Sequence, residues 1–504
     1  MSCSSDVRSL ALRASWVLVP VIAAAAAPAQ EGARVEDPAP PELLPVPDVP
    51  APAARPHPEL TFHRAPGALS PEAVTSDWPQ FLGPGGRNVC PETRLLKEWK
   101  DAGPTLVWEM EKGNGYSAPA IAGERLVLFH RVGDEEVVEC LHPETGQLYW
   151  QFRYPTDYRD AYGYGNGPRC CPLIDGELVY TDGVQGKLHC LKLTTGQLLW
   201  RRDLSEEFDV PQDFFGVVST PVVYGEHLIV HIGAPEGPCV ISLDKHTGRL
   251  SWGAGKEWKA GYATPVLGRV HGKDKCFVFT GGKSRPPSGG LICLDPATGA
   301  IDFQFPWRSK TYESVNASCP VLIGEQVFIS ATYETGGALL DLKPDGGYEV
   351  AWNSEVLSTH FNTSIHEGGY LYGFDGRNEP DASLVCQELA TGKQMWRKVL
   401  EWEETYELNG QVKPRPMSVY RGNLLAADGD YLCLGEQGHL LWLELTPTGV
   451  REISRTWLFA ARETWTPLVL SKGLLYVCQN TREFAGSHRP RLLCYDLRQA
   501  GESR

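Results

Sequence analysis

Short runs in which apolar and polar residues alternate recur along the whole chain, and residues 166–200 show the repeated unit most clearly. Alternation of this kind fits strands that bury one face of a sheet. Glycine between the runs supplies the positive φ that tight hairpin turns require. The unit is therefore predicted to hold four strands, at 172–174, 177–181, 187–193 and a fourth that ends at Trp200.

An aromatic residue marks the predicted fourth strand of each copy of this unit. The separations range from 42 residues between Trp108 and Trp150 to 61 residues between Trp396 and Trp457, which suits four-stranded propeller blades better than helical repeats. A Thr-Gly turn precedes most of these residues, and a small residue followed closely by proline opens most first strands. The marked positions are Trp108, Trp150, Trp200, Trp252, Phe303, Trp352, Trp396 and Trp457.

The two ends of the repeat region complement each other. The last repeat stops after its third strand, whereas 104–110 is a fourth strand with no first three strands before it. Placing the strand of Trp108 on the last blade pairs an otherwise open sheet edge and joins the chain ends. We predict an all-β, eight-bladed β-propeller of four-stranded antiparallel blades over residues 76–498, followed by a tail at 499–504.

The N-terminal residues predict export. Arg8 and Arg13 precede an apolar run at 14–27, and small residues follow it, so residues 1–29 are predicted to be a signal peptide. The run has about 14 residues, fewer than the roughly 20 that cross a membrane as a helix, and no second run follows. We expect an exported protein, periplasmic or extracellular, with no transmembrane segment. Residues 30–75 are rich in proline and are expected to form a disordered spacer that buries nothing.

Charge restricts the class of partner. The formal net charge is -15, and the acidic residues are scattered, so a nucleic-acid partner is not expected. We expect a monomer that binds a protein partner or a small polar ligand.

The cysteines divide into two groups. Cys140, Cys190 and Cys293, together with Cys386, occupy one equivalent position on separate blades, too far apart for disulfides, and are expected to be small buried residues. Cys170 and Cys171 are adjacent, with Cα atoms about 3.8 Å apart, so a bridge between them would be a strained ring that forms a rigid plate. Alternatively, the pair fills the slot before Pro172 as two small residues.

In a propeller the segments just before the first strands converge at one mouth of the central channel. Aromatic residues there offer stacking faces, arginine offers a fork for carboxylate or phosphate, and asparagine offers an amide, a combination that suits a flat anionic ligand. The alternative is that these side chains plug the channel and satisfy one another. The candidates are Tyr116, Asn166, Arg169, Cys170, Cys171, Phe215, Tyr262, Asn316, His360, Asn362, Arg421 and Trp465.

No catalytic residue can be assigned from spacing. His360 and His366 have no identifiable carboxylate partner, and the common hydrolase, kinase and dinucleotide motifs are missing from the sequence. Arg308 and Arg377, each close to an aromatic residue, are further polar candidates. No metal site is predicted.

The repeat, with its small-x-Pro opening, Thr-Gly turn and tryptophan, resembles the pyrroloquinoline-quinone-like (quinoprotein-type) β-propeller repeat family over roughly residues 77–497. The segments DWPQFLGPGGRN and FPWRSKTYESVNASCP resemble a planctomycete-type exported branch. In the quinoprotein alcohol dehydrogenases of this superfamily, a vicinal cysteine pair faces the quinone beside Ca²⁺, and Cys170-Cys171 is similar to that pair. No position here matches the calcium ligands, the stacking tryptophan or the catalytic aspartate. A related outer-membrane assembly factor holds a protein partner with its loops and has no cofactor.

These observations predict an exported, non-catalytic binding or scaffold module at the cell envelope. The alternative is a quinone-dependent alcohol or sugar oxidoreductase, with pyrroloquinoline quinone and Ca²⁺ at the channel mouth.

Overall fold

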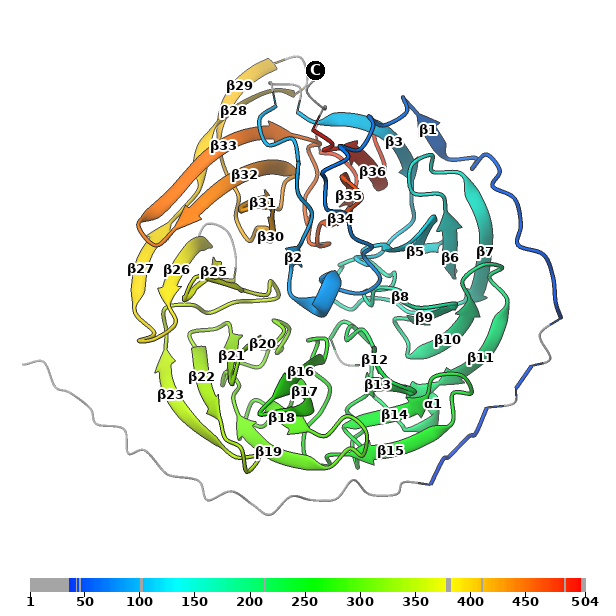
Figure 1. The fold of residues 1–504 in the computed structure, drawn as a ribbon, viewed down its shortest axis with the longest axis vertical. Helices are drawn as coiled ribbons and strands as arrows, with labels where there is room; N and C mark the ends of the chain where they lie inside the picture. Colours follow the sequence, from blue (N-terminus) through cyan, green and yellow to red (C-terminus); the bar gives the residue numbers. More distant parts are fainter. Residues whose placement is uncertain are drawn as a thin grey trace, which may run out of the picture.

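The computed structural model describes residues 36–499, apart from residues 42, 45–46, 100–102, 213, 378–381, 409–410 and 485. Eight four-stranded antiparallel blades form a closed ring, which confirms the predicted propeller (Figure 1). The predicted signal peptide, residues 1–29, lies outside the described residues. Within the described part of the chain, no helix is both long and apolar enough to cross a membrane.

Each blade runs from a short inner strand to a longer outer one. Blades 1 and 2 contain β4 (Ala120–Ala122), β5 (Arg125–Val132), β6 (Glu135–Leu141) and β7 (Leu148–Pro155), then β8 (Leu173–Asp175), β9 (Leu178–Asp182), β10 (Lys187–Lys192) and β11 (Leu198–Asp203). Blades 3 and 4 contain β12 (Val222–Tyr224), β13 (His227–His231), β14 (Val240–Asp244) and β15 (Leu250–Ala254), then β16 (Val266–Val270), β17 (Lys273–Thr280), β18 (Gly290–Leu294) and β19 (Ile301–Pro306).

The remaining blades continue around the ring. Blades 5 and 6 contain β20 (Val321–Ile323), β21 (Gln326–Ala331), β22 (Gly336–Leu342) and β23 (Tyr348–Ser354), then β24 (Ile365–Glu367), β25 (Tyr370–Asp375), β26 (Ser383–Glu388) and β27 (Gln394–Lys398). Blades 7 and 8 contain β30 (Asn423–Ala427), β31 (Asp430–Leu434), β32 (His439–Thr446) and β33 (Gly449–Trp457), then β34 (Val469–Ser471), β35 (Leu474–Gln479), β36 (Arg491–Asp496) and β3 (Thr105–Glu111). A hairpin of β28 (Glu401–Leu408) and β29 (Gln411–Ser418) lies between blades 6 and 7 in sequence, and α1 (Leu204–Glu207) follows β11.

The Thr-Gly turns join neighbouring blades. Gly196 has φ +71°, and a Cβ there would lie 2.5 Å from the ring of Trp150 on the preceding blade. Trp150 Nε1 also donates to the carbonyl of Leu193 at 2.9 Å. Only glycine permits this approach, so the repeated motif is a contact between blades. The same glycine-to-tryptophan contact joins Gly146 to Trp108, Gly248 to Trp200, Gly299 to Trp252 and Gly392 to Trp352.

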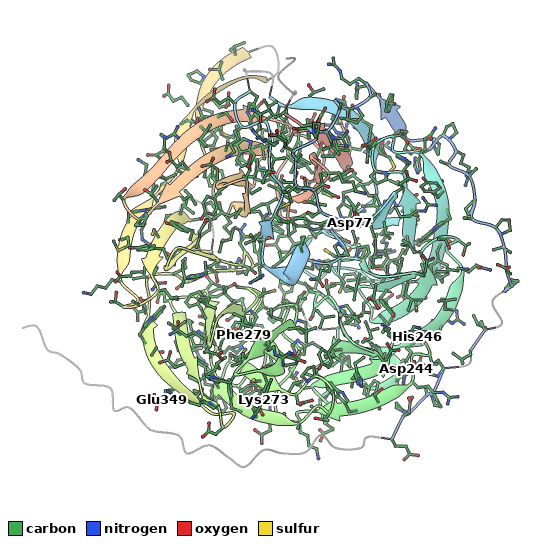
Figure 2. The ribbon with its side chains drawn as sticks, in the orientation of Figure 1. Asp77, Asp244, His246, Lys273, Phe279 and Glu349 are labelled. Atoms are coloured by element: carbon green, nitrogen blue, oxygen red, sulfur yellow. The ribbon has the colours of Figure 1, made fainter. Side chains whose placement is uncertain are left out.

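In blades 3 and 4 an aspartate three residues before the threonine fixes the Thr-Gly turn. Asp244 accepts hydrogen bonds from the backbone N and Oγ1 of Thr247, at 2.8 and 2.7 Å, and so fixes the turn at the outer edge (Figure 2). Phe279, by contrast, is fully buried in the core between blades. Aspartate side chains that bind their own backbone favour turns, whereas large apolar side chains fill the space between sheets.

Blade 7 departs from the repeat. In its register Ser454 lies opposite Trp442, where other blades have an aromatic residue opposite the third strand. Trp457 lies on β33, but opposite His439, and the two rings stack at 4.8 Å. Trp457 is therefore not equivalent to the other marker residues, and this part of the prediction was wrong. The buried ring of Trp442 on β32 donates to the carbonyl of Leu96 instead.

The predicted ring closure is confirmed. β3 pairs antiparallel with β36, and Trp108 lies opposite Cys494. A further strand, β1 (Leu60–Phe62), pairs with the outer side of β3. The first and last parts of the propeller thus share one sheet.

The expected spacer contacts the propeller, contrary to the prediction that it buries nothing. Asp37 forms an ion pair of 2.7 Å with Arg202, whose side chain is fully buried, and Arg55 bridges to Leu148 on β7. The described part of this segment follows the outer edge of the ring (Figure 1). A few of its residues form ion pairs, hydrogen bonds or strand pairs with blades 1 to 3 and 8. The proline content of the segment did not predict these contacts.

Residues 76–90 cross the centre of the ring (Figure 1). Trp78, only 1 % exposed, exchanges backbone hydrogen bonds with Ile121 on β4, and β2 (Val89–Cys90) pairs in parallel with the inner strand β30. A turn, η1 (Pro84–Gly86), lies between these contacts. The segment therefore forms a floor across the channel, and the side chains of Phe81 and Leu82 contribute to it.

Candidate functional site

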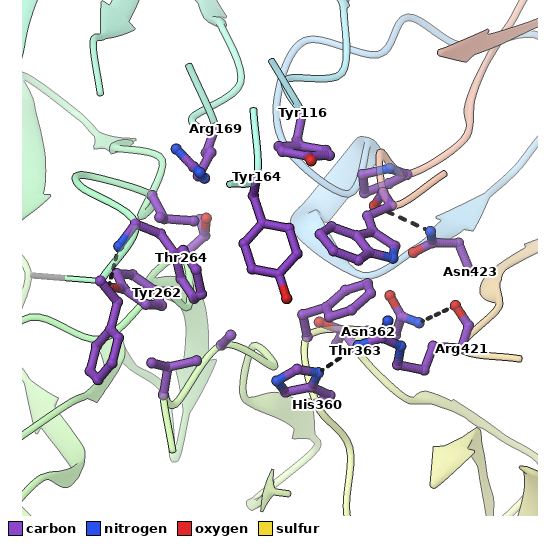
Figure 3. Close-up of a pocket in the computed structure, with 18 of the residues that line it drawn as sticks. Tyr116, Tyr164, Arg169, Tyr262, Thr264, His360, Asn362, Thr363, Arg421 and Asn423 are labelled. Atoms are coloured by element: carbon purple, nitrogen blue, oxygen red, sulfur yellow. Dashed lines mark hydrogen bonds between the residues drawn. The ribbon is translucent and has the colours of Figure 1, made fainter. Parts of the chain in front are cut away.

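A cavity of ≈ 270 Å³ lies at the channel mouth, bounded by Phe81 and Leu82 of the floor and by the segments that precede the first strands. The convergence predicted from the repeats therefore exists. The predicted site residues that line the cavity are Tyr116, Arg169, Phe215, Tyr262, His360, Asn362, Arg421 and Trp465 (Figure 3).

The other four predicted residues support the walls instead of lining the cavity. The side chain of Asn166 accepts from the backbone N of Asp160 at 2.8 Å, and Asn316 Nδ2 donates to the carbonyls of Thr280 and Trp307. Both amides hold loops in place. This agrees with the alternative prediction that side chains at the channel mouth satisfy one another and do not bind a ligand. Cys170 and Cys171 are buried between first strands.

The two adjacent thiols point to different partners. Cys170 Sγ donates to the carbonyl of Ser219 at 3.4 Å, whereas Cys171 Sγ accepts from the backbone N of Ala118 at 3.2 Å. Burial raises the pKa of both thiols, that of Cys171 to about 12. They are not bonded to each other, and every cysteine of the described residues is buried and free. The pair fills the slot before Pro172 as two small residues.

Two tyrosines of the loop between blades 1 and 2, the loop that also holds Asn166 and Arg169, were not identified from the sequence. Tyr162 and Tyr164 line the cavity, and Tyr164 lies at its centre (Figure 3). Tyr333 and Glu313 also line it, from two loops of the fifth blade. The alternation of tyrosine and glycine at 162–165 is the signal that could have found Tyr162 and Tyr164, because aromatic residues in a flexible turn are otherwise costly to expose.

One wall is organised by the buried carboxylate of Glu436. It accepts from Arg421 Nη2 at 2.6 Å, from the backbone N of Arg421 at 3.2 Å and from the indole N–H of Trp465. The Arg421 guanidinium carbon lies 5.2 Å from the Trp465 ring centre and 5.5 Å from that of Phe361. The ion pair thus fixes the orientation of an arginine and of the largest aromatic ring in the cavity.

An adjoining wall has a similar arrangement with different residues. Arg169 Nη2 lies 2.7 Å from Asp160 Oδ2, and its guanidinium carbon lies 5.8 Å from the ring centre of Tyr116. Tyr116 donates to Glu463 Oε2 at 2.9 Å, and burial, then the Glu463 charge, raises the pKa of its phenol. The Tyr116 ring stacks on Trp465 at 5.4 Å. The two walls therefore meet through aromatic rings.

His360 is neutral in this environment. Arg421 Nη1 donates to His360 Nδ1 at 3.3 Å. Burial, and then the positive charges of Arg421 and Arg377, lower the pKa of His360 to about 3. Near pH 7 its imidazole is therefore neutral, and its Nδ1 accepts the hydrogen bond from Arg421.

The cavity does not fit the quinone and calcium site that the resemblance implied. Cys170 and Cys171 do not line it. In the described part of the chain, no three His, Cys, Asp or Glu side chains lie close enough to hold a metal ion together. Of the described carboxylates at the cavity, Asp160, Glu436 and Glu463 already accept from arginine or tyrosine, and Glu313, which lines the cavity, is exposed.

Comparison with known proteins places this geometry in a family. The family model described as outer membrane protein assembly factor BamB matches residues 133–398, more than half of the chain. The chain belongs to this family of PQQ-like β-propeller repeats.

Two curated dehydrogenases are also similar in sequence. The dehydrogenase subunit of the quinone-dependent alcohol dehydrogenase of Gluconobacter oxydans is 26% identical over 47% of this chain and 33% of its own length. The quinoprotein alcohol dehydrogenase PedH of Pseudomonas putida is 23% identical over 59% of this chain and 47% of its own length. The alignments thus span less than half of either relative.

Solved structures share the fold. A europium-containing methanol dehydrogenase superposes with a TM-score of 0.56 at 11% identity, covering 84% of this chain and 98% of its own. The quinohemoprotein alcohol dehydrogenase of Comamonas testosteroni gives a TM-score of 0.56 at 11% identity, covering 85% of this chain and 81% of its own. At this identity the likeness concerns the architecture alone.

Proposed function

We propose that the protein is an exported, non-catalytic binding module at the cell envelope, and that its ligand occupies the cavity at the channel mouth. The observation that carries this proposal is the cavity itself, in which fixed aromatic rings surround a space of ≈ 270 Å³. Concave, largely apolar pockets with a few oriented polar groups are typical of ligand sites. The ligand is a small polar molecule or a polar segment of a partner protein.

The polar groups of the cavity favour binding over catalysis. Arg421 forms an ion pair with Glu436, and Arg169 forms one with Asp160. Both guanidinium groups therefore orient the neighbouring aromatic rings and are not available to stabilise charge on a reacting substrate. The recorded hydrogen-bond partner of His360 is Arg421, and among the described residues no carboxylate is paired with it that could orient it as a base. The description of the matching family as an assembly factor supports a binding role. The proposal of export rests on the pattern of residues 1–29.

A quinone-dependent alcohol oxidoreductase is the second candidate, favoured by the similarity to the two curated dehydrogenases. The position of Cys170 and Cys171 behind the wall weighs against it, because a buried pair cannot form one face of a quinone site in the cavity.

The two candidates are separated by mixing the purified protein with pyrroloquinoline quinone and Ca²⁺. We expect no shift of the quinone absorbance and no alcohol-dependent dye reduction. Dye reduction that disappears in a Trp465→Ala variant would establish the oxidoreductase and refute the binding module. Dye reduction that persists in this variant would indicate a reaction outside the cavity.

A further inference from the structure

The aromatic rings of the cavity continue outward as one connected path. From Trp465 at the wall, ring contacts lead to Tyr164 at 5.3 Å and on to Phe215 at 5.7 Å. Phe215 contacts Tyr162 at 5.9 Å, and the path then continues through Phe214 at 5.6 Å and Tyr312 at 5.1 Å. Tyr162 is 53% exposed and Tyr312 is 65% exposed, so the outer part of the path lies on the surface.

The exposed rings of this path, Tyr162, Tyr164 and Tyr312, require an explanation, because large aromatic side chains bury most of their surface in folded proteins. Tyr162 and Tyr164 come from the loop before blade 2, Phe214 and Phe215 from the loop before blade 3, and Tyr312 from the loop before blade 5, so three loops meet here, and all of these rings except Tyr312 line the cavity. A ligand longer than the cavity would cover them. The cavity itself, at ≈ 270 Å³, lies near the lower limit of about 300 Å³ for small-molecule pockets and suits a ligand of one ring.

The polar groups at the mouth have opposite hydrogen-bonding character. Arg377, which is exposed over the ring of Tyr333 at 4.6 Å, only donates, and the exposed carboxylate of Glu313 only accepts. The hydroxyls of Tyr162 and Tyr164 do both. A ligand hydroxyl, with one donor and two acceptor positions, can pair with any of these groups.

Charged ligands are less well matched. A carboxylate or phosphate would approach Glu313, an ammonium group would approach Arg377, and the protein as a whole has a formal charge of -15. Arg169 and Arg421 are already neutralised by buried carboxylates. The site therefore favours a neutral, hydroxyl-rich ligand with apolar faces that stack on aromatic rings, which is the chemistry of a sugar.

We propose that the cavity binds a neutral saccharide, with one sugar ring against Tyr164 and Trp465 and the following sugar rings against Tyr162, Phe214 and Tyr312. This inference rests on the proposed binding function and names the class of ligand.

The test is isothermal titration calorimetry of the full chain with neutral gluco-, manno-, xylo- and galacto-configured tetrasaccharides and their monosaccharides. Tetragalacturonic acid and inorganic phosphate serve as charged comparisons. We expect at least one neutral tetrasaccharide to bind. Tyr164→Ala should weaken binding by about tenfold, because it removes one stacking ring, whereas Tyr164→Phe keeps the ring and most of the affinity.

A variant of Tyr312, the outermost ring of the path, tests whether a longer ligand extends beyond the cavity. Tyr312→Ala should weaken the binding of the tetrasaccharide but leave the binding of the monosaccharide unaffected. Phe62→Ala, which removes an exposed ring on β1, should change the binding of neither. Melting temperatures of all variants show whether they fold.

The outcomes distinguish this inference from the function on which it rests. Binding of phosphate or tetragalacturonic acid alone, lost in Tyr164→Ala, would overturn the saccharide class and leave the binding module standing. No binding by any neutral saccharide would also overturn the saccharide class, and saccharide binding unchanged in folded Tyr164→Ala would overturn the cavity as the saccharide site. Cavity-dependent dye reduction with quinone and Ca²⁺ would overturn both.

Discussion

Among single residues, the buried carboxyls of Asp182 and Glu136 connect the fold to pH. Asp182 is 1% exposed, and its Oδ1 has no hydrogen-bond partner among the described residues. Burial, and then the neighbouring charge of Glu136, raise the pKa of Asp182 well above its ordinary value of 3.8. Burial also raises the pKa of Glu136. Ionising the buried Asp182 carboxyl beside Glu136 therefore costs free energy.

The sign of the pH effect follows from these directions. Because the folded chain holds the Asp182 proton more tightly, its contribution to stability is complete below pH 3.8 and is lost as the pH rises toward the raised pKa. Asp182→Asn should flatten the decline of unfolding free energy as the pH rises above 3.8, by up to about 1.4 kcal/mol per pH unit over the titration. Urea denaturation at several pH values gives the unfolding free energy of the wild type and of Asp182→Asn. Parallel profiles for wild type and variant would contradict the prediction.

The sequence could predict those site residues that lie close to the first strand of a blade. Tyr116, Arg169 and Trp465 lie directly before first strands, so the repeat fixed their position at the mouth. Tyr164 lies in a longer loop, and its place at the cavity centre depends on how that loop folds back, as in the hydrogen bond from Gly165 N to Tyr116 Oη at 3.3 Å. Such a tertiary contact leaves no spacing signal.

At the scale of elements, the Thr-Gly turn is the unit that holds blades together. The contribution of this turn to the unfolding free energy can be measured by substituting two glycines of blade 2. Gly176 has φ +57° with open space around its Cβ position, whereas a Cβ at Gly196 would lie 2.5 Å from the ring of Trp150.

Gly176→Ala should cost about 1–2 kcal/mol of unfolding free energy, because alanine is strained in the left-handed conformation. Gly196→Ala should cost this amount and about 1–3 kcal/mol more, because the tryptophan must also move. Urea denaturation of both variants gives the two values. Equal losses would show that the turn conformation matters and the tryptophan contact does not.

Blade 7 shows where element-level prediction failed. Its strands were recognisable as alternating runs, but the position opposite Trp442 is Ser454, and Gly449 has no atom near its Cβ position. The aromatic residue had moved from the fourth to the third strand. Counting tryptophans therefore gave the right number of blades, although the residue counted for blade 7, Trp457, does not hold the equivalent position.

At the scale of the whole molecule, the ring is closed by strands from opposite ends of the chain. β3 precedes the first blade in sequence but pairs with β36 in the last. The sequence could predict this closure because an orphan strand and an open edge complement each other. It could not predict that the proline-rich segment follows the ring, because contacts such as Asp37 with Arg202 involve single side chains with no repeat.

Closure gives Trp108 a role that the equivalent Trp150 does not have. Both are buried and both donate to a carbonyl of the next blade, at 2.8 and 2.9 Å. Trp108→Ala and Trp150→Ala should each lower the unfolding free energy by about 3–5 kcal/mol. Trp150 lies within a covalently continuous blade, whereas Trp108 lies on the strand that joins the chain ends.

Limited proteolysis should therefore distinguish the two variants. We expect early cleavage between β1 and β3 in Trp108→Ala, because local opening of β3 exposes this segment without unfolding the other blades. Trp150→Ala should be cleaved only as the whole propeller unfolds. Mass spectrometry of the first fragments identifies the cut. The same first cut in both variants would mean that closure is no weaker than any other contact between blades, and that the ring opens as one unit.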